Sequence, residues 1–233
     1  MATSGTYNFT ITRDEIIAAA LRTLGAFGVA DTIPANDISN CAQALNILVK
    51  TMVAKGLPLW CVEQLMIPMI IGQDTYDLNT YTTGNYRPPR ILNAFLRNPP
   101  GNDVNLSIVS RYDYNLLGSK DSPGIPNQLF VNPQRDNTYV TVYNVPNLVS
   151  YTLHLTAQRP IQDFNLATDN PDMPSEAFQA LKWGLADELA LEYASPQMNF
   201  TMVQQKAKMF MDELMAFEQE QASVYFTPAQ RSR

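Results

Sequence analysis

The chain has few of the side chains on which catalysis and metal binding depend. Its 233 residues include a single histidine, His154, and only two cysteines, Cys41 and Cys61. It also lacks a Gly-x-Ser-x-Gly turn, a phosphate-binding loop and a dinucleotide fingerprint. Because a triad or a metal site needs several such groups within reach of one another, we expect no enzyme activity, no catalytic residue, no cofactor and no metal.

The scarce residues have simpler interpretations. His154 alternates with Leu153 and Leu155 along an expected strand, which places its ring on the more polar face and predicts a surface or interface residue. Cys41 falls on the apolar face of an expected helix, as a small core residue does. The cysteines lack metal or redox spacing, and a disulfide between Cys41 and Cys61 stays open, although a reducing cytosol disfavours it.

Basic residues and long apolar runs are scarce too. Lysine and arginine number 16 against 22 acidic residues, a net charge of −6. A protein that grips DNA through its phosphates is normally basic, so this chain could surround DNA without adhering to it. The apolar stretch Leu65–Ile71 contains Pro68 and is shorter than the ~18 residues of a membrane span. Since Met1–Thr10 also lacks the features of a signal peptide, we expect no membrane partner.

What the chain has in quantity is helical patterning toward both ends. Thr12 and Glu15 form a capping box, and the apolar stripe that follows stops at Gly25 or Gly28. A second helix is expected from about Asn36 to Lys55, a third after Pro174 and a fourth after Pro196. The inward faces of the last two are Phe178, Leu181, Leu185 and Leu189, and Val203, Ala207, Phe210, Leu214 and Phe217.

Between the helical ends the periodicity changes to two, which predicts strands. The expected strand regions are 64–78 (with a turn at 72–74), 90–97, 104–109, 128–131, 139–143 and 151–158, and a short helix is expected at 111–117. Short proline- and glycine-rich turns separate them and favour antiparallel pairing. We therefore predict an α+β fold. Residues 1–62 and 172–225 form a bundle of about four helices, residues 63–171 an inserted antiparallel β-rich domain, and residues 226–233 a C-terminal arm.

Two helix faces admit a functional interpretation. Asp187, Glu188 and Glu192 lie within two turns, and paired carboxylates can act as acid and base in glycosidases. The favoured interpretation is the solvated face of an amphipathic helix. A methionine-rich stripe formed by Met198, Met202, Met209 and Ala216, called the outer stripe below, could be core or a partner face.

Several short phrases resemble the head-to-tail connector proteins of short-tailed bacteriophages, also called adaptor, tail tubular or packaged-DNA stabilisation proteins. In order along the chain they are Ile-Gly-Gln-Asp-Thr-Tyr-Asp-Leu78, Ser-Arg-Tyr-Asp-Tyr114, Gly-Ile-Pro126, Val-Tyr-Asn-Val-Pro146, Arg-Pro-Ile161, and Pro-Ser-Glu-Ala-Phe-x-Ala-Leu-Lys-Trp-x-Leu-Ala186. Each phrase is weak, and their order and spacing make the match specific. The chain departs from the family in a long turn region at 79–89.

The resemblance implies a structural virion protein made in the host cytoplasm. It implies a dodecameric ring beneath the portal that joins head to tail, extends the DNA channel, retains packaged DNA and contacts the portal and the next tail component. Tyr225, Phe226, Arg231 and Arg233 are then candidate portal contacts, since aromatic and arginine side chains are enriched at hot spots; the alternative is a frayed terminus. The alternative functions are a phage-associated cell-wall hydrolase using Glu188 or Glu192, or another head-completion or tail protein.

Overall fold

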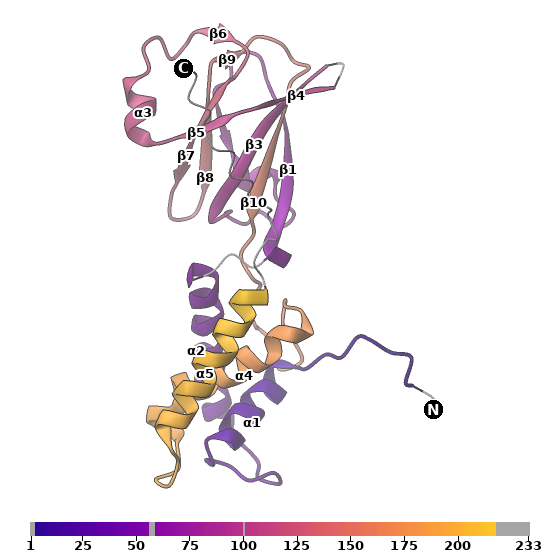
Figure 1. The fold of residues 1–233 in the computed structure, drawn as a ribbon, viewed down its shortest axis with the longest axis vertical. Helices are drawn as coiled ribbons and strands as arrows, with labels where there is room; N and C mark the ends of the chain where they lie inside the picture. Colours follow the sequence, from indigo (N-terminus) through magenta and orange to yellow (C-terminus); the bar gives the residue numbers. More distant parts are fainter. Residues whose placement is uncertain (1–2, 56–58, 100, 218–233) are drawn as a thin grey trace, which may run out of the picture. The chain divides into compact units, whose positions relative to one another are not determined.

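The structure, a computed structural model, describes residues 3–55, 59–99 and 101–217 (Figure 1).

The first helix begins and ends where its side chains dictate. Helix α1 (Arg13–Thr23) starts at Thr12, whose backbone N–H and hydroxyl both donate to the Glu15 carboxylate, at 2.8 and 2.9 Å. This confirms the predicted start. Gly25, at φ 69°, adopts the left-handed conformation that glycine accepts without strain, so the helix stops there rather than at Gly28.

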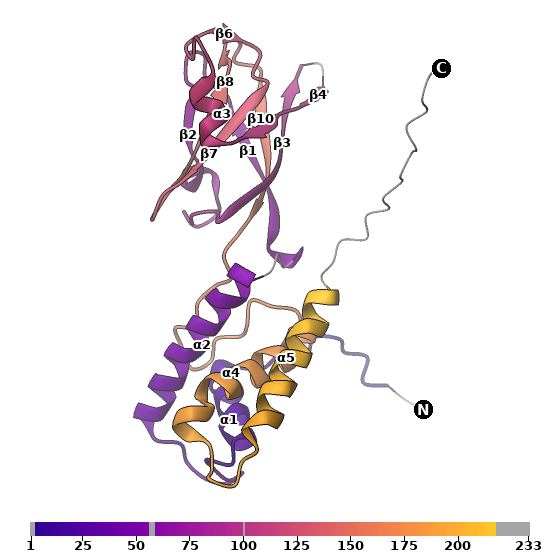
Figure 2. The same ribbon diagram turned by 60° about the vertical axis from the view of Figure 1, so that its left-hand side comes forward.

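Helix α4 (Phe178–Tyr193) contacts the other long helices of its unit. It packs on α1 and on α5 (Phe200–Phe217), and Gly184 lies close enough to Leu48 of α2 (Ala35–Lys55) that a Cβ would meet its methyl carbons at 3.2 and 3.3 Å. Figure 2 shows α4 and α5 side by side. Because neighbours lie on several sides, α4 buries residues around most of its circumference: Ala180, Leu181, Gly184, Leu185, Ala186, Leu189 and Ala190.

Helix α5 packs mainly on α4. The sequence favours burial of Phe210 and Leu214 against the first two helices. Leu214 is 7% exposed, but Phe210 is half-buried and its ring stacks on Trp183 of α4, with centroids 6.3 Å apart. For Phe210 the predicted partner is therefore wrong, because Trp183 supplies a large aromatic surface one helix nearer.

The strands form two four-stranded sheets and one small bridge. The first sheet has the order β1 (Val62–Pro68), β10 (Thr152–Gln158), β3 (Arg90–Asn98), β4 (Asn102–Asn105). The second has the order β2 (Thr75–Asp77), β8 (Thr138–Tyr143), β7 (Gln128–Pro133), β5 (Ser107–Val109), and β6 (Pro123–Gly124) pairs with β9 (Val145–Pro146). Leu65, Leu96 and Leu153 of the first sheet and Tyr76 and Val140 of the second belong to one core cluster. The sheets thus pack face to face as a sandwich.

The pairing differs from the expected antiparallel neighbours in two ways. β1 and β2 lie in different sheets although a short turn joins them, and the predicted strand 104–109 divides at Leu106, where the chain passes from the first sheet to the second. β5 pairs with β7, and β6 with β9, in parallel. The prediction of a purely antiparallel domain is therefore wrong for these two pairs. Neither pair is joined by a hairpin, because α3 (Arg111–Leu116) lies between β5 and β7, and β7 and β8 lie between β6 and β9.

The chain divides into two compact units. The first contains the chain up to Leu48, Leu166–Asn170 and the chain from Pro174; the second contains Val49–Asn165 and Pro171–Met173. The boundary between the units falls inside α2, whereas the sequence pattern predicts a boundary between residues 62 and 63. Because α1, α4 and α5 lie in the first unit and all the described strands lie in the second, the chain is an α+β protein.

The burial of Leu214 yields a stability prediction. Replacing Leu214 by alanine removes a side chain that is 7% exposed, so the free energy of unfolding should fall by roughly 2–5 kcal/mol. Met202→Ala, on the outward side of α5 at 44% exposure, is the matched control and should change it by less than about 0.5 kcal/mol. Denaturant unfolding measures both. Equal stability of the two variants would contradict the packing of α5.

Candidate functional site: the outer face of helix α5

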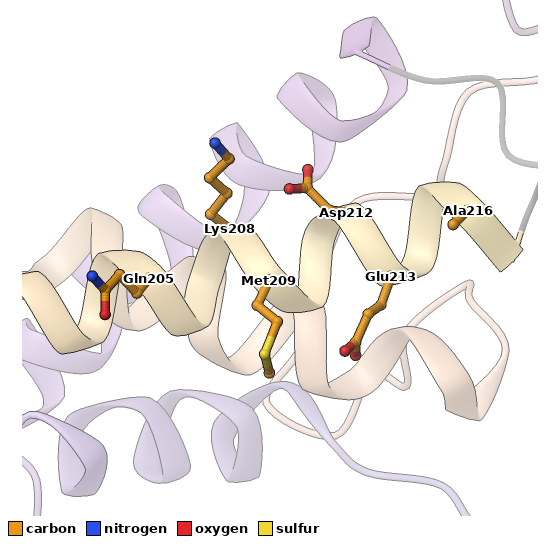
Figure 3. Close-up of a pocket in the computed structure, with 6 residues that line it drawn as sticks. All are labelled: Gln205, Lys208, Met209, Asp212, Glu213 and Ala216. Atoms are coloured by element: carbon orange, nitrogen blue, oxygen red, sulfur yellow. The ribbon is translucent and has the colours of Figure 1, made fainter.

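The outer face of α5 carries a shallow hollow. Val203, Ala207 and Leu214 recur at spacings of four and seven and are buried, so the opposite side of the helix faces outward. The hollow is lined by Gln205, Lys208, Met209, Asp212, Glu213 and Ala216 (Figure 3). All six belong to α5, so a single amphipathic helix provides the described part of this surface.

The outer stripe belongs to this exposed face. Met202 is 44% exposed and Met209 is 38% exposed, while Met198 is half-buried and Ala216 is exposed. Of the two interpretations left open by the sequence, the core assignment is excluded for Met202 and Met209. Methionine side chains are flexible and polarizable, and they adapt to irregular partner surfaces. The stripe therefore has the chemistry of a docking face.

Charges of both signs border the stripe. In Figure 3, Lys208 and Asp212 project along one edge of the helix, and Glu213 projects with Met209 along the other. Lys206 lies on the Met209 side, and its Nζ is 5.8 Å from the centroid of the Phe210 ring. Within the described part of the chain, none of these four charged groups makes an ion pair. The two lysines lie toward the start of the helix and the two carboxylates toward its end.

This arrangement suits binding rather than chemistry. The hollow offers apolar contact area and three ionic groups, Lys208, Asp212 and Glu213, but no histidine, cysteine or serine among its lining residues. Throughout the described ranges, no group of three or more His, Cys, Asp or Glu side chains could hold a metal ion, and no helix is long and apolar enough to cross a bilayer.

Two of the three carboxylates considered for acid–base chemistry are exposed to solvent. Glu188 and Glu192 are exposed on α4, and Asp187 is half-buried. The solvated-face interpretation is confirmed for the first two. The charge of Glu192 acts on the buried thiol of Cys41: burial, then Asp37, then Glu192 raise the pKa of Cys41 to about 11. Cys41 is thus a protonated core residue near neutral pH, and Cys41 and Cys61 do not form a disulfide.

His154 is not the surface residue predicted by the sequence. It is 4% exposed, and its ring stacks on Phe95, its direct neighbour on β3, with centroids 4.6 Å apart. Its Nδ1 has no hydrogen-bond partner among the described residues. The prediction fails because alternation along β10 identifies the face of the sheet but not the aromatic cross-strand neighbour that covers it.

A second exposed apolar group lies on loops at one end of the strands. Backbone hydrogen bonds join these loops: Gly72 N–H donates to Pro146 at 3.1 Å, and Val145 N–H donates to Ser122 at 3.0 Å. The exposed aliphatic side chains on them are Ile70, Ile71, Ile125, Leu148 and Val149. Segments 70–73, 122–126 and 146–150 contain no charged residue, so this surface is both apolar and neutral.

The candidate portal contacts Tyr225, Phe226, Arg231 and Arg233 lie outside the described residues, as does the C-terminal arm 226–233. Sequence reasoning identified the outer stripe but missed the charges beside it. The signal was present: Lys208 and Asp212 are four residues apart and flank Met209.

No protein-family model matches the chain, and a search of curated proteins finds no match either.

The buried state of His154 predicts an acid-sensitive fold. Burial, and next the positive charge of Arg97, lower the pKa of His154 below its ordinary value of 6.5, while Asp103 opposes them. The unfolded chain then binds the proton at a higher pH than the folded chain. The stabilisation is fully present above pH 6.5 and is lost as the pH falls through the lowered folded pKa.

The measurement is urea unfolding of the wild type and His154→Phe between pH 7.5 and pH 5. Phenylalanine keeps a ring against Phe95 and cannot be protonated. We expect the wild type to lose more stability on acidification than the variant, since acidic residues contribute equally to both. Parallel pH profiles would contradict the assignment.

Proposed function

We propose that this chain is a structural virion protein of a short-tailed bacteriophage, forming a ring beneath the portal that joins head to tail. The observation that carries the proposal is the ordered series of connector-like phrases along a chain whose helical ends enclose a β-rich middle. The ring would extend the DNA channel and help to retain packaged DNA. Its partners would be the portal, the next tail component and other copies of the same chain.

The positions of the phrases in the fold support this interpretation. The Tyr76 hydroxyl accepts from the backbone N–H of Ile70 at 3.1 Å and donates to the carbonyl of Gln73 at 3.0 Å, closing the turn before β2. Ser110 caps α3, and Arg159 makes a double contact with Asp172, including one bond of 2.8 Å. These residues shape the fold through their hydrogen bonds, as expected if the phrases mark a structural family.

The arrangement of the helices supports a finer proposal, in which all four long helices form one bundle that faces the portal. The contacts of α4 with α1, α2 and α5 favour it. The neutral aliphatic loops described above are suited to a protein contact, and we assign them to the next tail component. The net charge of −6 favours a channel through which DNA passes without adhering.

Binding to the portal tests the proposal. The purified chain is mixed with the portal protein of the same virus and imaged by cryo-electron microscopy. We expect a ring of this chain on the portal, with twelve copies as the resemblance implies. A failure to bind the portal, with a folded protein on both sides, would reject the connector function.

The hydrolase alternative makes the opposite prediction for two carboxylates. If the protein is structural, Glu188→Gln and Glu192→Gln leave infectivity unchanged, because both side chains are exposed on the solvated side of α4. Complementation of a virus lacking the gene provides the measurement. Normal particles that have lost infectivity would instead favour the enzyme.

The C-terminal contacts make a separate prediction. If Tyr225, Phe226, Arg231 and Arg233 bind the portal, deletion of residues 224–233 should reduce attachment to portal-bearing heads, since such side chains dominate binding energies. Co-sedimentation of the protein with heads measures attachment, and circular dichroism checks that the shortened chain folds. Attachment at the wild-type level would remove these residues from the interface.

A further inference from the structure

The charges on the outer face of α5 are arranged so that the face complements itself. Lys208 and Asp212 border one edge of the outer stripe, and Glu213 borders the other (Figure 3). Helical spacing places Lys206, seven residues before Glu213, on the same edge as Glu213. Each edge therefore carries a lysine toward the start of the helix and a carboxylate toward its end. Met209 lies between the lysines and the carboxylates. If the helix is turned end for end about Met209, each lysine takes the place of the carboxylate on the same edge, and each carboxylate takes the place of the lysine.

We propose that two copies of the chain pair through this face, with the α5 helices antiparallel and a two-fold axis passing next to Met209. In an antiparallel pair, each edge of one helix meets the same edge of the other. Lys208 then faces the partner's Asp212, and Lys206 faces the partner's Glu213. Symmetry repeats both contacts, so the pair contains four ionic contacts around a centre formed by the two Met209 side chains.

The charge pattern also opposes the alternative arrangement, in which the two α5 helices are parallel. In a parallel pair, opposite edges meet at the same height along the helices. Lys208 would then approach the partner's Lys206, and Asp212 would approach the partner's Glu213. Like charges in contact are unfavourable and act as a specificity device. The antiparallel pair converts the same four side chains into attraction, which is the argument for a second copy as the occupant of this face.

The apolar part of the face agrees with this occupant. Met202 and Met209 are 44% and 38% exposed, and the antiparallel register brings the partner's Ala216 toward Met202. A small residue opposite a long flexible one allows close approach of two helices. One helix per copy makes a small contact, below the roughly 1,200 Å² of standard interfaces, so the pair should be reversible and dependent on concentration. This pairing is independent of the proposed ring.

Sedimentation velocity of the full chain over a range of concentrations tests the pairing. We expect a reversible shift from 26.1 kDa toward twice that mass. Met209→Glu places two carboxylates on the axis and should weaken the dimer at least about tenfold. Leu191→Glu adds the same charge at a side chain of α4 that is 91% exposed and should leave the dimer unchanged. A wild type that stays monomeric, or a dimer that resists Met209→Glu, overturns the proposal.

Charge reversal tests the orientation. Lys208→Asp should weaken the dimer, and the double variant Lys208→Asp/Asp212→Lys should restore it, because the swapped charges still oppose each other. Failure of the double variant to recover rejects this pairing. Circular dichroism confirms that each variant retains its helices.

Cross-linking tests the register. Met209→Cys should form a disulfide with its own counterpart under mild oxidation. Ala216→Cys should not, because antiparallel reversal separates the two positions by about 14 residues, or about 21 Å along the helix. The native Cys41 and Cys61 are buried and serve as an internal background. Cross-linking at both positions indicates parallel helices and overturns the antiparallel pair.

Discussion

The burial of α4 is the constraint on which the helical unit depends. This helix comes from the C-terminal part of the chain, and its buried residues extend around most of its circumference, so it needs protein neighbours on several sides. It is covered by α1 and α2 from the other end of the chain and by α5, and Gly184 permits the close approach of Leu48. The two ends of the chain must therefore meet, and the strands between them form a separate compact unit.

The same requirement explains why α5 has two different faces. One face, with Val203 and Leu214, completes the cover over α4 and contributes Phe210 to the stack on Trp183. On the opposite face, Met202 and Met209 remain 44% and 38% exposed. An exposed apolar stripe bordered by both signs of charge is a surface of this unit that is suited to a partner.

In the β-rich unit the organising feature is the passage of the chain between two sheets. Leu106 is 4% exposed, and its backbone N–H donates to Ala94 at 3.0 Å, so the chain crosses from β4 to β5 without leaving the core. The crossing explains why neighbouring strands in the sequence are not always neighbours in a sheet. Tertiary packing also buries His154, although its strand pattern places the ring on the more polar face of the sheet.

The sequence by itself determined the local elements, because capping groups and hydrophobic periodicity act over a few residues. Thr12 and Glu15 predicted the start of α1, the predicted helix from Asn36 to Lys55 is observed from Ala35 to Lys55, and the strand regions are found close to their predicted positions. Only the tertiary structure decided strand order, the parallel pairs, the partner of Phe210 and the burial of His154. Each of these depends on a residue far away in the chain, and no periodicity specifies which distant surface a face will meet. The outward direction of Met209 depends on both the sequence and the tertiary structure. The sequence pattern defined the stripe, and the packing of α5 on α4 left it exposed.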